Sequence, residues 1–235
     1  MKPEIKKAQT SDTYDSMYAQ GGHENVYELP YNHSCYYPLF KKVCEVIKQK
    51  KLKNVLEVGC GNGALAQMIL GNYPDINYSG FDFSSVAIEK AKSRLKDNAD
   101  NVSCADATDD ESYTTSTDYN CIVCLEVLEH IPNDLEVISK WPKGTTCICS
   151  VPNFDSTYHE RFFTNKDEVT YRYSELLDIE KISRVKKPVI ADISWRKKLQ
   201  ALIWYRYKPR MLIQVCGLTS FEKSGGWFLF VGTKK

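Results

Sequence analysis

Residues 125–134 read LEVLEHIPND, and they bring two carboxylates and an imidazole close together in the chain. Glu126, Glu129 and His130 stand three and four positions apart, a spacing that places all three side chains on one face of a helical turn. Such a set can bind a divalent metal ion, can move protons in acid/base catalysis, or can be ordinary surface. The elements around it decide between these three.

Strand-like and helix-like runs alternate through most of the chain. Leu39, Val43 and Ile47 recur at helical spacing, and Ser84 can cap another helix. We predict strands over 54–58, 76–83, 101–104, 119–125, 145–151 and 179–185 and in the closing GGWFLFVGTKK, and helices over about 35–50, from the glycines at 59–63 to about 71, from 85 to about 96, from Pro132 to about 140, and over 192–207. This alternation is typical of an α/β fold with a doubly wound, mostly parallel sheet and helices on both faces.

The domain organisation follows from the same pattern, since no linker or repeat interrupts it. We expect a single domain over 1–235. Residues 1–33 form an irregular N-terminal arm, 34–151 a cofactor-binding core, and 152–235 the substrate side with a late helical insertion over about 192–207.

Composition narrows the class of protein. With 43% hydrophobic and 26% charged residues in 235, the chain has the balance of a soluble globular protein, and a net charge of +1 gives no general attraction for nucleic acid or anionic membrane. No export signal and no run long enough to span a bilayer is evident, so stable membrane insertion is not expected. Nine cysteines, several inside strand-like runs, indicate reduced, buried thiols in a cytoplasmic protein rather than zinc ligands.

The stretch VLEVGCGNGAL (55–65) predicts a binding site. A strand runs into Gly59, Gly61 and Gly63 and is followed directly by a helix, so the backbone can approach a ligand closely. Asp82 ends the next strand, where a carboxylate can bind ribose hydroxyls. Glu57 would repel a pyrophosphate but suits a ligand that carries an ammonium group. A nucleoside with a cationic part fits this combination.

At this point the sequence resembles the class I S-adenosylmethionine-dependent methyltransferases. Their first motif, E-x-G-x-G-x-G, is matched by Glu57, Gly59, Gly61 and Gly63, with Cys60 inside the turn. The resemblance covers residues 34–151 and implies that Asp82 with Phe83 meets the ribose, that Asp106 and Ala107 meet the adenine, and that Leu125 and Glu126 lie beside the methyl donor. It also implies seven strands, with the last one antiparallel, and S-adenosylmethionine as cofactor.

Methyl transfer is an in-line displacement for which the protein mainly positions the acceptor, but a hydroxyl acceptor also needs a base or a metal. SVPNFDSTYHERFF follows the fifth strand at the same sheet edge and supplies His159 and Arg161. His130 and His159 are therefore candidate general bases. Alternatively, Glu126, Glu129, His130 and His159 form a metal site, which resembles the E-x-x-E-H plus distant histidine of small-RNA 2′-O-methyltransferases; an E-x-x-E-H turn also occurs in ubiquinone-pathway O-methyltransferases. Such donors suit Mn²⁺, Co²⁺, Fe²⁺ or Zn²⁺ better than Mg²⁺, and purely structural roles stay open.

Two segments are candidates for controlling the substrate. In the arm, Tyr14, Tyr18, Gly21-Gly22 and His23 fit a lid that closes on binding, or the tyrosines simply pack; Arg161 is a further substrate candidate. The late segment has no acidic residue between Asp192 and Glu222 and mixes six basic residues with Trp and Tyr. It fits RNA phosphates, a membrane surface, an acidic small molecule, or a solvated face over a packed stripe.

The function that these features predict is methyl transfer from S-adenosylmethionine to a small molecule, at oxygen or nitrogen, with a histidine or a metal assisting deprotonation. One alternative is an RNA 2′-O-methyltransferase that uses the four-residue metal set and the basic segment. The alternative from another class is a regulatory subunit that binds the cofactor without turnover, because fold and cofactor do not specify the substrate.

Overall fold

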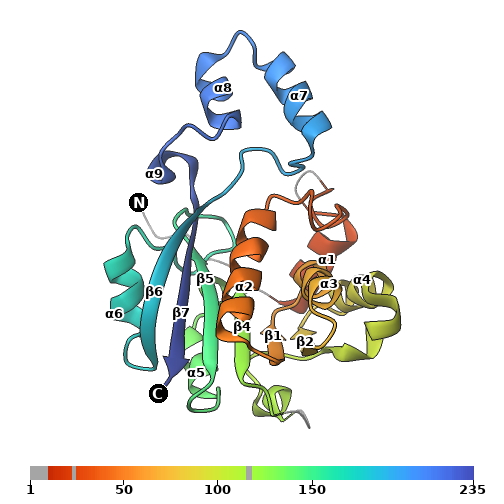
Figure 1. The fold of residues 1–235 in the computed structure, drawn as a ribbon, viewed down its shortest axis with the longest axis vertical. Helices are drawn as coiled ribbons and strands as arrows, with labels where there is room; N and C mark the ends of the chain where they lie inside the picture. The colour runs from red at the N-terminus through yellow and green to blue at the C-terminus, as the bar shows by residue number, and fades with distance from the viewer. Residues whose placement is uncertain (1–9, 23–24, 115–117) are drawn as a thin grey trace.

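The computed structural model describes residues 10–22, 25–114 and 118–235, and a seven-stranded sheet forms its centre (Figure 1). The strand order is β3-β2-β1-β4-β5-β7-β6. The bounds are β1 Asn54–Val58, β2 Asn77–Asp82, β3 Val102–Cys104, β4 Cys121–Leu125, β5 Thr146–Pro152, β6 Leu177–Lys186 and β7 Gly226–Lys234. All neighbours pair in parallel except β7, which is antiparallel to both β5 and β6. The predicted doubly wound sheet with an antiparallel last strand is confirmed.

Helices cover both faces of this sheet because its strands alternate their side chains between two cores. Val55 of β1 points into one core, whereas Leu56 and Val58 point into the other. The first core is covered by α2 (Tyr37–Lys50), α3 (Ala64–Asn72) and α4 (Ser85–Leu95), and the second by α5 (Asp134–Ser139), α6 (Lys166–Tyr173) and α9 (Phe221–Ser224). Such two-sided burial explains why the central strands are almost continuously apolar.

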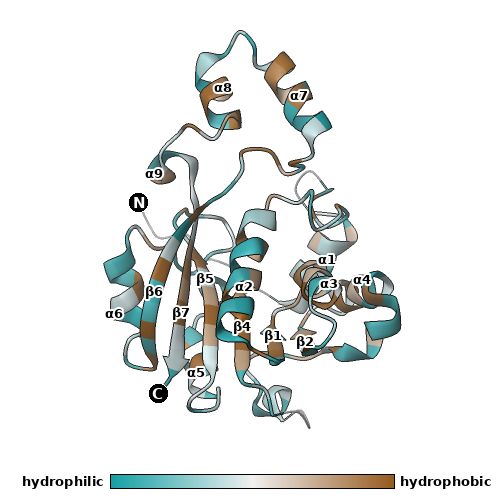
Figure 2. Ribbon diagram, viewed as in Figure 1, coloured by the Kyte–Doolittle hydropathy of each residue, from teal (hydrophilic) through white to brown (hydrophobic). Residues whose placement is uncertain are grey.

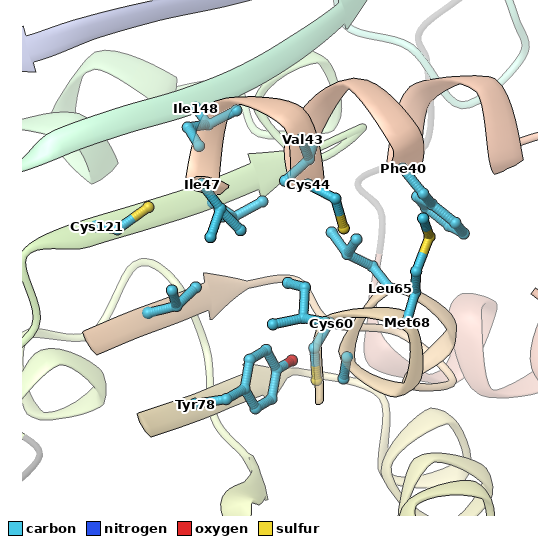
Figure 3. Close-up of a cluster of buried hydrophobic side chains, with 14 of the residues drawn as sticks. Phe40, Val43, Cys44, Ile47, Cys60, Leu65, Met68, Tyr78, Cys121 and Ile148 are labelled. Carbon is cyan, nitrogen blue, oxygen red and sulfur yellow. The ribbon is translucent and has the colours of Figure 1, made fainter. Parts of the chain in front are cut away.

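Figure 3 shows how the first core closes over the cofactor-side strands. Phe40 and Cys44 of α2 face Leu65 and Met68 of α3, and the Tyr78 ring lies beneath them next to Cys60. The glycine-rich turn is therefore anchored by packing on both of its flanks. Seven of the nine cysteines are buried, as the sequence predicted.

The N-terminal arm differs from the prediction of an irregular segment, because α1 forms a regular helix over Ser11–Ala19. Polar residues dominate it, but Tyr14, Met17 and Tyr18 recur at spacings of three and four and line the cavity described below. Asp15 anchors the helix to the start of α4, accepting hydrogen bonds from Ser84 Oγ (2.5 Å), Ser85 Oγ (3.1 Å) and the Val86 amide (3.2 Å). A tertiary contact thus orders a segment that its own composition leaves undecided.

The late insertion also differs, since one helix was predicted over 192–207 and two are present. α7 spans Trp195–Trp204 and α8 spans Pro209–Val215. Pro209 has no amide hydrogen to donate and begins α8 at its first turn, where a proline is well tolerated. Among the described residues, no helix is both long and apolar enough to cross a membrane.

Candidate active site

The turn between β1 and α3 requires glycine at each of three positions. Gly59, Gly61 and Gly63 have φ values of +73°, +51° and +72°, in the left-handed region that L side chains rarely adopt. A Cβ on Gly59 would lie 2.2 Å from Cγ2 of Val127, and one on Gly61 would lie 2.5 Å from the Tyr18 hydroxyl oxygen. A Cβ on Gly63 would instead crowd Ala91 of α4 at 3.1 Å. Gly59 and Gly61 therefore open the cavity, while Gly63 lets α3 and α4 pack closely.

Two buried carboxylates flank this turn. Asp82 at the end of β2 accepts hydrogen bonds from the Gly61 amide (2.9 Å) and the Ser84 amide (3.0 Å), so it fixes the turn as well as facing the cavity. Glu57 accepts a hydrogen bond from the Tyr78 hydroxyl at 2.7 Å. Burial raises the pKa of Glu57 to about 8 and raises that of Asp82 above its usual range. A cationic or hydroxyl-rich ligand would relieve this desolvation and stabilise both charged forms.

A cavity of about 630 Å³ runs from these carboxylates along the carboxyl edge of the sheet. That volume suits a cofactor-sized ligand. Gly63 is the one predicted cofactor residue that does not line it. The others do: Glu57, Gly59, Cys60, Gly61, Asp82, Phe83, Asp106, Ala107, Leu125 and Glu126. Asp106 is exposed there, and its Oδ1 already accepts hydrogen bonds from the Thr108 amide and hydroxyl, both at 2.8 Å.

Glu126 is held by side chains of the neighbouring strands. Its Oε1 accepts from Ser150 Oγ (2.8 Å) and its Oε2 accepts from Trp227 Nε1 (2.5 Å). Its backbone has a φ of +57°, a strained conformation for a non-glycine residue. Burial raises the pKa of Glu126 to about 7. Because both oxygens are engaged in this way, Glu126 lines the cavity without joining the histidine cluster next to it.

Glu129, His130 and His159 form that cluster. One donor atom from each residue lies within 4.8 Å of the others, and the two imidazole rings are 5.0 Å apart. His130 Nδ1 donates to the Tyr158 carbonyl at 2.7 Å, and His159 Nδ1 donates to the Phe154 carbonyl at 3.1 Å. In the neutral rings these bonds put both lone pairs on Nε2. The distant His159 therefore does reach the turn that begins at Glu126.

Glu129 is the least satisfied group in this cluster. Its side chain is fully buried, and within the described residues neither carboxylate oxygen has a hydrogen-bond partner. His130 Nε2 lies 3.8 Å from Glu129 Oε1. Burial, reinforced by the nearby Glu126, raises the pKa of Glu129 well above its usual range. A buried carboxylate without donors is costly unless it is protonated or meets a cation, so this geometry fits a bound metal ion.

The position of His130 predicts a pH-dependent stability. Burial lowers its pKa from 6.5 to about 4, so the folded protein holds a neutral imidazole that protonates at higher pH when the chain unfolds. The stability that the neutral His130 side chain contributes is therefore fully present above pH 6.5. About 3 kcal/mol of it is lost as the pH falls towards 4. We expect the difference in unfolding free energy between the wild type and His130→Gln to shrink by that amount between pH 7 and pH 4 in urea titrations. A difference that stays constant with pH would contradict the buried neutral imidazole.

The predicted lid and substrate residues divide into three groups. Tyr14 packs edge-on against Phe83 (4.9 Å between ring centroids) and against His130 (5.8 Å), and Tyr18 lies over Gly61. His23 lies outside the described residues. Arg161 instead donates to the carbonyls of residues 128, 131 and 132 and lies 3.3 Å from the Asp134 carboxylate. It fastens the turn that carries Glu129 and His130, and it is not part of the cavity lining.

Sequence reasoning missed several residues that complete the cavity. Lys187 Nζ lies 4.6 Å from the centre of the Phe154 ring, and both residues line the cavity near Glu126. Trp227 and Ser150 hold Glu126, as described above. Their position in the sheet was the available signal. β6 runs parallel to β5, so Lys187, the residue after its carboxyl end, lies at the binding edge, where the antiparallel β7 also begins.

Comparison with known proteins places this geometry in context. The family described as "Methyltransferase domain" matches residues 56–143. The chain is 25% identical over 153 residues to trans-aconitate 2-methyltransferase from Rhodococcus jostii, covering 59% of this chain and 58% of that protein. It is 32% identical over 89 residues to ubiquinone biosynthesis O-methyltransferase from Thiobacillus denitrificans, covering 37% of each. The matches therefore span less than two thirds of these relatives' length.

Solved structures agree on the fold. A methyltransferase from Geobacter sulfurreducens, determined with S-adenosyl-L-homocysteine, superposes with a TM-score of 0.54 at 14% identity, covering 94% of this chain and 98% of that one. The likeness covers more of the chain than the family match, which is confined to residues 56–143.

Proposed function

We propose that this chain, as a class I S-adenosylmethionine-dependent methyltransferase, methylates a hydroxyl group of a small molecule. The cofactor would lie along the glycine turn. Glu57, with its raised pKa of about 8, would face the ammonium group, and Asp82 would accept from the ribose hydroxyls. The open faces of Gly59 and Gly61 would allow the backbone to approach the ligand.

The choice of a hydroxyl acceptor rests on one observation. Within the described residues the Glu129 carboxylate has no hydrogen-bond partner, and it lies beside the lone pairs of two histidines. We infer that Glu129, His130 and His159 hold a divalent cation, of the kind that mixed oxygen and imidazole donors prefer. When bound, such an ion would lower the pKa of an acceptor hydroxyl. The chain's own part is to orient both histidines. Their Nδ1 atoms donate to the Tyr158 and Phe154 carbonyls, which leaves the Nε2 lone pairs to act as metal ligands.

A histidine base without metal is the second candidate, and the lowered pKa of His130 supports it. A pKa of about 4 keeps the ring neutral and able to accept a proton at pH 7. The two candidates predict different responses to chelation, because only the first needs the cation. The relatives named for methylation of trans-aconitate and in ubiquinone biosynthesis also favour a small-molecule acceptor over a macromolecule.

Turnover with labelled cofactor tests the proposal. The purified chain would be incubated with methyl-labelled S-adenosylmethionine and paired acceptors that differ only in carrying a hydroxyl or an amine, before and after dialysis against a chelator. We expect label on the hydroxyl members, a loss of at least about tenfold on dialysis, and recovery with Mn²⁺ but not with Mg²⁺.

Three outcomes would count against parts of this proposal. Unchanged activity after dialysis would leave the histidine base and exclude the metal. Preferential labelling of the amines would contradict the hydroxyl acceptor. Binding of the cofactor without label transfer to any acceptor in the panel would favour a regulatory subunit over an enzyme.

A further inference from the structure

The segment 192–220 between β6 and β7 stands away from the sheet (Figure 1). Its two helices bury almost nothing: Ala201 is the one buried side chain of α7, and α8 has none. Described contacts with the rest of the chain are concentrated at its base, where the Ile193 amide donates to the His33 carbonyl (2.7 Å) and Lys186 Nζ donates to the Thr219 carbonyl (2.7 Å). The helices themselves therefore present free surface.

That surface is unusually apolar. Within the described residues, eleven large hydrophobic side chains are exposed, and seven of them belong to this segment. Figure 2 shows hydrophobic stretches on both helices. Trp195, Leu199 and Ile203 follow one another at intervals of four, so they form a stripe along one face of α7. The full set is Trp195 (71% exposed), Leu199 (50%), Ile203 (52%), Trp204 (73%), Tyr207 (82%), Ile213 (46%) and Leu218 (76%). A soluble monomer seldom leaves such a group in water without a partner.

Apart from Asp192 at its first position, the charges of the segment 192–220 are all positive. No acidic residue lies between Asp192 and Glu222, and the basic ones are Arg196, Lys197, Lys198, Arg206, Lys208 and Arg210. The remainder of the chain holds 25 basic and 29 acidic residues, a net charge of −4. An anionic surface would thus attract this segment while repelling the rest, which fixes the orientation of docking.

We propose that the segment 192–220 docks on the surface of a bilayer that contains anionic lipids. Tryptophan and tyrosine favour the headgroup level, aliphatic side chains enter the acyl boundary, and arginine and lysine pair with lipid phosphates. RNA would use the basic and aromatic residues but would leave Leu199, Ile203, Ile213 and Leu218 in water. The helices would lie in the interface and would not cross it. Docking is a binding property and does not depend on methyl transfer.

Vesicle flotation with the full chain tests this docking. Vesicles of phosphatidylcholine alone would be compared with vesicles in which about a third of the lipid is phosphatidylglycerol. We expect at least about tenfold stronger partitioning onto the anionic vesicles, with a blue shift of tryptophan emission, because apolar contact and charge act together. Equal binding to both vesicle types, or binding to neither, would overturn the proposal.

Variants separate lipid docking from simple charge attraction. Leu199→Ser with Ile203→Ser should lower binding to anionic vesicles about tenfold, as should Lys197→Glu with Lys198→Glu. Tyr171→Ser, at a side chain 89% exposed on α6, is the matched control and should bind like the wild type. Binding that survives loss of Leu199 and Ile203, or displacement from vesicles by mixed-sequence RNA, would contradict a lipid surface. All substituted side chains are exposed, and circular dichroism checks that the variants fold.

Discussion

Asp82→Ala is expected to weaken binding of S-adenosylhomocysteine about a hundredfold. The carboxylate lies in the cavity and would accept from the ribose hydroxyls, and two hydrogen bonds to a charged acceptor contribute together about 3 kcal/mol. The same carboxylate also accepts from the Gly61 and Ser84 amides, so its loss releases the glycine turn that should hold the cofactor. Isothermal titration of the purified variant measures the change in Kd directly.

Two further variants serve as controls for the measured Kd. Asp75→Ala removes a carboxylate whose side chain is 87% exposed, and it should leave the Kd unchanged. Asp82→Asn keeps one acceptor oxygen and should give an intermediate loss. An unchanged Kd for Asp82→Ala in a variant that melts cooperatively would mean that Asp82 supports only the turn and does not touch the ligand.

Glu129→Gln is expected to abolish stabilisation by Mn²⁺ and to lower turnover about a thousandfold. A cation that binds only the folded state raises its stability, by about 2.7 kcal/mol at a hundred times its Kd. The variant keeps the size of the side chain but cannot lose a proton to become an anionic ligand. Without metal it should melt no lower than the wild type, because burial already keeps the fully buried Glu129 side chain neutral and the amide is neutral as well. Thermal melts with and without Mn²⁺ give this readout independently of any acceptor.

The affinity for Mn²⁺ should also depend on pH. Because burial raises the pKa of Glu129 well above its usual range, Mn²⁺ must displace a proton, and its affinity should rise with pH. The control is Glu175→Gln, which changes an exposed carboxylate and should leave the Mn²⁺ shift intact. If Glu129→Gln still responds to Mn²⁺ like the wild type, the cluster does not bind the ion.

Much of the cofactor half of the molecule could be predicted from local sequence. β1 spans Asn54–Val58 as predicted, and Ser84 caps α4 through a 3.1 Å hydrogen bond from the Ala87 amide. These features are local: a buried strand needs a short apolar run, a left-handed turn needs glycine, and a cap needs a hydroxyl at one position. The boundaries of α1 and of the late insertion could not be predicted equally well, because a packing contact orders the first and Pro209 divides the second.

The sequence by itself determined which residues could do chemistry, and the tertiary structure decided which of them meet. Glu126 and Glu129 are equivalent in the printed chain, yet Ser150 and Trp227 bind the first while the second is left buried beside His130 and His159. Arg161 was a substrate candidate by sequence, but its guanidinium donates to the carbonyls of residues 128 and 131. Composition and spacing act over a few residues, whereas Ser150 and Trp227 lie 24 and 101 residues from Glu126 in the chain, and only the folded sheet brings them together.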